Sequence, residues 1–171
     1  WGGAVDGSCV NSGGRYSLLA NRWRATNSSA SAPSARRLHT AVWTGHEMIV
    51  WGGNAEAYSY GSVLRTGSRY DPYTDTWTPT NAGPTAPSAR GIHTAVFTNG
   101  RMIVWGGSPD GYYTNSGGRY DPSTNTWTPT SVASGVPQGR FSHTAVVADG
   151  KMIVWGGVSG GGPNIGGVYD P

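Results

Sequence analysis

The sequence repeats one long phrase three times at a nearly constant spacing. The phrase is HTAVWTGHEMIVWGG at residues 39–53, HTAVFTNGRMIVWGG at 93–107 and HTAVVADGKMIVWGG at 143–157. Its last three letters also open the chain, so Trp-Gly-Gly recurs with a period of 50 to 54 residues, at Trp1, Trp51, Trp105 and Trp155. A period of this length is typical of repeat architectures, in which each repeat buries its apolar face against its neighbours.

Each repeat consists of a fixed frame and one variable segment. A tyrosine precedes a tryptophan by seven residues, an arginine follows that tryptophan by 13, and a histidine follows the arginine by three. Only the interval between Gly-Gly and the tyrosine changes, from 12 to 17 residues. This combination predicts a rigid scaffold with variable loops. The frame residues are Arg36, His39, Gly52, Gly53, Tyr70, Trp77, Arg90, His93, Gly106, Gly107, Tyr120, Trp127, Arg140, His143, Gly156 and Gly157.

Each repeat reads as four short strands, and no segment has the periodicity of a helix. The first strand follows the histidine, and a glycine-containing turn connects it to the apolar strand Met-Ile-Val-Trp. Gly-Ser-Arg-Tyr or Gly-Gly-Arg-Tyr forms the third strand, and Thr-Trp-Thr-Pro forms the fourth after an Asp-Pro turn. Because proline cannot donate to a neighbouring strand, Pro79 and Pro129 place this fourth strand at a sheet edge.

The double glycine after an apolar strand, with a tyrosine and then a tryptophan seven residues on, resembles the kelch repeat of β-propellers. The resemblance covers essentially the whole chain. It implies an all-β fold in which each repeat forms a four-stranded blade, with the strand beside the histidine innermost and the tryptophan strand outermost. The first repeat departs from the pattern, because it has SLLANRW at residues 17–23 in place of the Asp-Pro turn.

The repeats form a single array that starts and stops within blades. We predict the second half of a blade over 1–35, whole blades over 36–89 and 90–139, and an incomplete blade over 140–171. This amounts to about three four-stranded blades plus part of a fourth, and hence to a partial ring. The last repeat overlaps in phase with the first, which counts against a ring built from several copies. We therefore expect a segment of a longer chain, with the multi-chain ring as the alternative.

Composition argues against several classes of function. The formal charge is only +3 and the arginines are scattered, so no nucleic-acid partner is expected. No stretch approaches the roughly 18 apolar residues of a membrane span. Cys9 is the only cysteine, which excludes an internal disulfide and a multi-cysteine metal site. The low lysine content and the abundance of Gly, Ser and Thr favour an extracellular or periplasmic location.

One face of the predicted array gathers the variable loops. Because successive strands of a blade alternate in direction, the loop between the second and third strands emerges beside the link to the next blade. Two of these loops hold paired tyrosines, and aromatic faces with guanidinium groups can bind sugar rings, carboxylates or a protein surface. The candidate ligand-binding residues are Tyr58, Tyr60, Arg65, Asp110, Tyr112 and Tyr113.

The residues that recur in every repeat are interpreted as structural. We expect Arg36, Arg90 and Arg140 to bond backbone carbonyls between blades. The three frame histidines are expected to satisfy hydrogen bonds between blades and not to bind a metal. No cofactor is expected.

No catalytic constellation is visible, since the sequence has neither G-x-S-x-G nor a P-loop, nor a pair of acids spaced for acid–base work. We predict a non-catalytic binding or scaffold module with a protein or glycan partner on the loop face. The rest of the ring would come from further blades of the same chain or from other chains. Two alternatives stay open. One is a structural component of an extracellular or surface assembly. The other is a kelch-like enzyme, a sugar mutarotase or isomerase or a copper oxidase, whose active site lies partly outside this segment.

Overall fold

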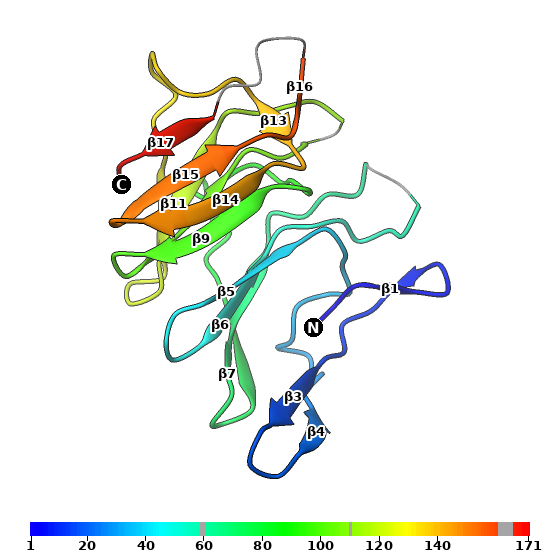
Figure 1. Cartoon of the computed structure of the whole chain (residues 1–171). Coiled ribbons are helices and arrows are strands. Elements are labelled where there is room, and N and C mark those ends of the chain that lie inside the picture. The colour runs from blue at the N-terminus through cyan, green and yellow to red at the C-terminus, as the bar shows by residue number, and fades with distance from the viewer. Residues whose placement is uncertain (59–60, 110, 161–165) are drawn as a thin grey trace.

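The computed structural model describes residues 1–58, 61–109, 111–160 and 166–171, and these residues contain strands and no helix. Four antiparallel sheets, here called blades I to IV, follow one another along the described chain (Figure 1). Blade I is β3 (Gly14–Ser17) and β4 (Arg22–Ala25). Blade II is β5 (Thr40–Trp43), β6 (Met48–Trp51), β7 (Gly67–Asp71) and β8 (Thr76–Pro79). Blade III is β9 (Thr94–Thr98), β10 (Arg101–Trp105), β11 (Gly117–Asp121) and β12 (Thr126–Pro129). Blade IV is β14 (Thr144–Ala148), β15 (Lys151–Trp155) and β17 (Gly167–Tyr169).

The strand order confirms the predicted propeller arrangement. The complete sheets run β5-β6-β7-β8 and β9-β10-β11-β12, so the strand after the histidine and the tryptophan strand form opposite edges. The first strands β5, β9 and β14 contact one another in turn and form the inner side of the array (Figure 1). Among the described residues two blades are complete. Blade I contains an outer pair of strands, and blade IV contains three strands.

The segments between the predicted strands contain two further short sheets. In one, β1 (Ala4–Val5) pairs with β2 (Ser8–Cys9) inside the first variable loop. In the other, β13 (Arg140–Phe141) pairs with β16 (Val158–Ser159). The sequence analysis treated these residues as loops and links, because two-residue strands leave no periodic signal.

The turns between the first two strands of blades III and IV follow from their sequence. Asn99 and Gly100 have φ of 49° and 73°, and Asp149 and Gly150 have φ of 49° and 77°. Two consecutive residues with positive φ make the type I′ turn that joins two twisted antiparallel strands. Asn, Asp and Gly tolerate this conformation better than other residues, so the turn chemistry agrees with the prediction.

The apolar core lies between blades. Trp51 of blade II is fully buried and lies 5.3 Å from Trp127 of blade III, with the ring planes tilted by 57°. Tyr120 also packs against Trp127, with 5.0 Å between the ring centroids, as Tyr70 packs against Trp77 at 4.8 Å. Each outer tryptophan therefore packs on its own blade and on the preceding one, so each blade completes the core of its neighbour.

Each frame arginine is buried in a cage of uncharged oxygen atoms. Arg90, 1% exposed, donates from Nε to the carbonyl of Ser88 (3.0 Å) and from Nη1 to the carbonyls of Gly106 (3.0 Å) and Ser116 (2.7 Å). Its Nη2 donates to the hydroxyls of Ser88 and Ser116. Burial lowers the pKa of Arg90 to about 10, so the guanidinium stays protonated at neutral pH.

These bonds correct the predicted role of the arginines. Gly106 and Ser116 flank the loop between β10 and β11, so the guanidinium of Arg90 holds its own blade to the link before it. The contact with the neighbouring blade comes from the backbone, because the amide of Gly53 in blade II donates to the carbonyl of Arg90 (2.9 Å). The amide of Gly107 makes the same bond to the carbonyl of Arg140 (2.8 Å).

Replacing Arg90 by lysine should destabilise the fold strongly. An ammonium group carries three donors and cannot reproduce the planar set of guanidinium bonds, so buried acceptors lose their partners. We expect R90K to lower the free energy of unfolding by about 2–4 kcal/mol, measured by urea denaturation. The control is R101A, because Arg101 is exposed and forms only a long surface ion pair with Asp121 (3.4 Å). R101A should change stability by less than about 0.5 kcal/mol, and equal effects of the two changes would contradict the assignment.

Candidate functional site

The variable loops and the links between blades meet on one face of the array. Residues directly after the frame arginines pair with the first residues after the double glycines. Arg37 bridges Asn54, Gly91 bridges Ser108, and Phe141 pairs with Val158 in the sheet of β13 and β16. This arrangement follows from the alternating direction of the strands, as the sequence analysis expected.

A groove lies on this face where the links converge. We call it the mouth groove, and its volume is about 450 Å³. Its lining residues are Arg37, Leu38, Ile92, Ser108, Gly111, Phe141 and Ser142. The walls are largely apolar, because Leu38, Ile92 and Phe141 form much of them. Each of these residues comes from a different link, and the three links follow one another along the chain. The polar groups stand among these apolar side chains, an arrangement typical of binding sites.

The floor of the mouth groove is made by backbone in an unusual conformation. Leu38, Ile92 and Ser142 have φ of 56°, 57° and 53°. The amide of Ile92 donates to the carbonyl of Leu38 (3.1 Å), and the amide of Ser142 donates to the carbonyl of Ile92 (3.3 Å). Positive φ is costly for a β-branched residue such as Ile92, and such strain is often found at binding sites. The groove therefore has a floor that hydrogen bonds between blades hold in place.

The structure brings one of the predicted ligand-binding residues to this groove. The ring of Tyr113 stacks on Phe141 at 5.3 Å with 25° between the planes. Tyr112 beside it is 77% exposed. The ring of Tyr113 therefore extends the apolar wall that Phe141 forms.

Two other predicted residues, Tyr58 and Arg65, do not line the mouth groove. Tyr58 is exposed and lines a separate hollow of about 530 Å³ with Cys9, whose thiol donates to the carbonyl of Asn54. The guanidinium of Arg65 donates to the carbonyl of Gly83 (2.8 Å), so it braces the link to blade III, a structural role that the sequence analysis did not predict. Tyr60 and Asp110 are outside the described residues, and their assignment stays a prediction.

The sequence analysis missed the link residues of the groove, although a signal was present. The frame motif reads RRLH at 36–39, RGIH at 90–93 and RFSH at 140–143. Its first and last letters are constant while the two between them change in every repeat. These changing positions supply most of the groove. Variable positions enclosed by a fixed frame are thus as informative as variable loops.

The frame histidines bridge successive blades. The ring of His93 lies edge-on to Trp51 of the preceding blade at 5.4 Å, and its Nε2 bonds the hydroxyl of Thr40 (2.9 Å). His143 repeats both contacts with Trp105 (5.2 Å) and Thr94 (2.7 Å). In the described part of the chain, no three side chains of His, Cys, Asp or Glu are grouped as metal ligands would be.

Burial keeps these histidines neutral. Desolvation lowers the pKa of His93 to about 3, and nearby positive charge on Arg90 acts in the same direction. Burial likewise lowers the pKa of His39 and of His143 to about 4. A neutral imidazole is what the contact with a buried tryptophan edge requires, because a charged ring would lose its hydration there.

Sequential four-stranded blades with inner histidine strands, outer tryptophan strands and double glycines at each joint define a kelch-type β-propeller. The family model described as the KLHDC2/KLHL20/DRC7 Kelch-repeats domain matches residues 1–169. The chain belongs to the kelch-repeat family. Comparison with curated proteins gave no match.

Membership of this family sets the coarse function. Kelch-repeat domains are in general non-catalytic propeller modules that bind proteins. No helix in the described part of the chain has the length and apolar character needed to cross a membrane.

The histidines should make stability depend on pH. An unfolded histidine binds a proton below about pH 6.5, whereas the folded ones stay neutral down to pH 4 or below, so acid favours unfolding. Stability should be constant above pH 6.5. Between pH 6 and 4 it should fall by up to about 1.4 kcal/mol per pH unit for each buried histidine. Urea titrations at several pH values measure this slope.

The variant H93Q should reduce that slope by about one third, whatever its effect on stability at pH 7, because one of three buried histidines is gone. The control H46Q removes an exposed histidine on the β5–β6 turn and should leave the slope nearly unchanged. An unaltered slope in H93Q would show that His93 takes up its proton in the folded state.

Proposed function

We propose that this chain is a non-catalytic binding module that holds a protein partner in the mouth groove. The observation that carries the proposal is the contrast between frame and groove. The frame repeats the same residues in every blade, whereas the groove is lined by side chains that change from blade to blade. A scaffold needs only the frame, so the changing, partly apolar groove is the surface fitted to a ligand.

The chemistry of the groove favours a protein over a glycan. Leu38, Ile92 and Phe141 surround the centre, and burying an apolar side chain of a partner between them is favourable. Tyr113, stacked on Phe141, and the exposed Tyr112 next to it in the sequence provide rigid aromatic contact area for a partner's surface. Ser108, Ser142 and Arg37 supply polar groups that orient the bound segment. We place this module outside the cytoplasm, in keeping with its low lysine content.

Variants of the groove should weaken binding without unfolding the chain. Peptides selected against the chain from a random display library would serve as probes. We expect F141A and the double variant Y112A/Y113A each to raise the Kd of such peptides at least tenfold, because they remove the apolar wall and the rim. Their melting temperatures should fall by only a few degrees, since these side chains contribute little to the core between blades.

The matched control is Y73A. Tyr73 is 83% exposed and belongs to the β7–β8 turn, which the alternation of strands places on the opposite face. Y73A should leave peptide affinity unchanged. Peptides that respond to Y73A and not to F141A would contradict the proposal. Enrichment on a glycan array in place of peptides, with loss in Y112A/Y113A, would favour the sugar-binding alternative.

A further inference from the structure

The turn between β3 and β4 presents two leucines to solvent. Leu18 is 87% exposed and Leu19 is 100% exposed. The alternation of strands places this turn on the face opposite the mouth groove, and Figure 1 shows it at the lower end of the view. Turns are built mostly from Gly, Pro, Asn, Asp and Ser, so the folding of the turn does not explain two adjacent leucines.

The backbone of this turn has the same design as the corresponding turn of blade III. Asn21 has φ of 47° and Asn125 has φ of 54°. The phenol of Tyr16 donates to the side chain of Asn21, as the phenol of Tyr120 donates to that of Asn125. The difference lies in the side chains at the tip, because the two leucines replace Pro-Tyr in blade II and Pro-Ser in blade III.

Exposure of the tip is a property of the repeat. Leu19 corresponds to Tyr73 of blade II, which is 83% exposed although blade II has a neighbour on each side. Arg15 of blade I donates to the carbonyl of Pro72 at that turn (2.7 Å), and blade II makes the same bond to blade III. A neighbouring blade thus bonds the backbone beside the tip and leaves the next side chain in water.

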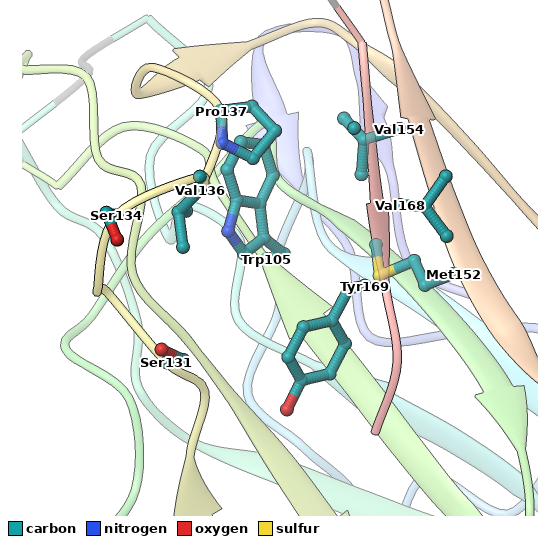
Figure 2. A pocket seen from close by; sticks show the side chains of 11 residues that line it. Trp105, Ser131, Ser134, Val136, Pro137, Met152, Val154, Val168 and Tyr169 are labelled. Atoms are coloured by element: carbon teal, nitrogen blue, oxygen red, sulfur yellow. The ribbon is translucent and has the colours of Figure 1, made fainter.

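The apolar side chains of the links, in contrast, are used between blades. Figure 2 shows Val136 and Pro137 of the link before blade IV lining a cavity of about 210 Å³ together with Trp105 of blade III. Val136 packs there against a cluster that contains Trp105 and Met152. Leu19, which is fully exposed, contributes to no such cluster, so its apolar surface is available to another molecule.

Two exposed arginines follow the turn directly. Arg22 begins β4, and Arg24 lies roughly 7 Å further along the strand. The two side chains point to the same side, because successive residues of a strand alternate. Blades II and III have threonine at both positions, and those threonines are exposed as well. The outer hairpin of blade I therefore differs from its counterparts by two leucines and two positive charges.

Negative charge is scarce around these arginines. Residues 7–46 contain five arginines and no acid, although the whole chain has nine acidic residues. The acids of the neighbouring turn are already bonded, since Asp75 pairs with Arg15 (3.1 Å) and Asp71 accepts from the amide of Tyr73 (2.7 Å). The hairpin thus combines an apolar tip with positive charge that acids of the same chain do not neutralise.

We propose that the β3–β4 turn inserts into the surface of an anionic lipid membrane. Leu18 and Leu19 enter the apolar layer below the headgroups, while Arg22 and Arg24 bind the lipid phosphates. An interfacial anchor is buried by only about 5–10 Å, which suits a tip whose arginines begin three residues after Leu19. Their long side chains can reach the phosphates while the backbone lies lower.

The shape of the tip favours lipid over a folded protein partner. A stable protein interface needs about 800 Å² from each partner, far more than two side chains on a protruding turn supply. A bilayer needs no matching pocket, because apolar insertion and attraction to anionic headgroups add together. The mouth groove lies on the opposite face, so membrane binding leaves it accessible.

The test measures partitioning of the 171-residue chain onto lipid vesicles by co-sedimentation. We expect binding to vesicles of equal parts phosphatidylcholine and phosphatidylglycerol, and much weaker binding to phosphatidylcholine alone. The variant L18S/L19S should lower the partition coefficient at least tenfold. Its melting temperature and its affinity for mouth-groove peptides should stay nearly unchanged, because neither leucine belongs to the core.

The arginines are tested by giving blade I the residues of the other blades. R22T/R24T should weaken binding to the anionic vesicles about tenfold and leave binding to the neutral ones unchanged. R22K/R24K keeps both charges and should retain most of the affinity. The control R101A removes an exposed arginine of blade III and should have little effect.

A fluorescent probe locates the inserted turn. In a C9S background, L19C or S123C is labelled with a nitrobenzoxadiazole group, whose emission shifts to the blue in an apolar environment. Ser123 is the matched position, because it follows Tyr120 by three residues as Leu19 follows Tyr16. We expect anionic vesicles to shift the emission of the probe at position 19 and not at position 123.

Four results would overturn the proposal. The first is equal partitioning of the wild-type chain and L18S/L19S, and the second is an equal shift at positions 19 and 123. The third is binding of single-stranded RNA but not of vesicles, lost in R22T/R24T, which would assign the arginines to nucleic acid. The fourth is a dimer that L18S/L19S dissociates in the absence of vesicle binding, which would assign the leucines to a second copy.

Discussion

The rest of the structure depends on the buried arginine that begins each blade. Its guanidinium fixes the loop between the second and third strands to the incoming link, as Arg90 does through Gly106 and Ser116. Its own carbonyl receives the amide of the preceding double glycine. One residue therefore closes its own blade and attaches that blade to the preceding one. Hydrogen bonds to carbonyl and hydroxyl oxygens offset the cost of burying the guanidinium charge. Because these acceptors are uncharged, the contact does not depend on the ionisation of a carboxylate.

The joint also explains why the sequence phrase is so constant. Gly52 has φ of 67°, and a Cβ at that position would lie 2.7 Å from Cε1 of His93, so no side chain fits there. His93 lies beside this glycine and edge-on to Trp51, and burial keeps its imidazole neutral. Each of these requirements applies to a different residue of the repeated segment, so few of its positions can change without disturbing the contact between blades. The amino acid changes from repeat to repeat at the positions that face the mouth groove and in the loops after the double glycine.

The sequence alone could predict the strands and the face on which the loops gather, because these follow from periodicity and alternation of direction. The order of the strands within a blade was implied by the resemblance to the kelch repeat. It could not predict which residues the face would bring together. Phe141 and Ile92 are 49 positions apart in the chain, and their contact with one groove depends on three links converging. The role of Arg65 was missed for the same reason, since its acceptor, the carbonyl of Gly83, is defined only by the folded link. The frame arginines were predicted to bond carbonyls between blades, but their guanidinium groups bond their own blade and the link before it. Spacing identifies a structural residue, but it does not show which of its atoms bonds which blade.

The same internal repetition that identifies the fold also gives the structure its own reference states. Three contacts between a tryptophan and the histidine of the next blade, and two outer tryptophans bonded to the link before their blade, show what each surface of a blade contacts. Trp155 and Gly156 continue this comparison. Trp51 and Trp105 are buried under the histidine of the next blade, whereas Trp155 is exposed and nothing lies within 4 Å of the Cβ position of Gly156. The difference between these tryptophans therefore shows what the histidine of a following blade contributes to a joint, because it covers the indole and at the same time closes the space beside the first glycine.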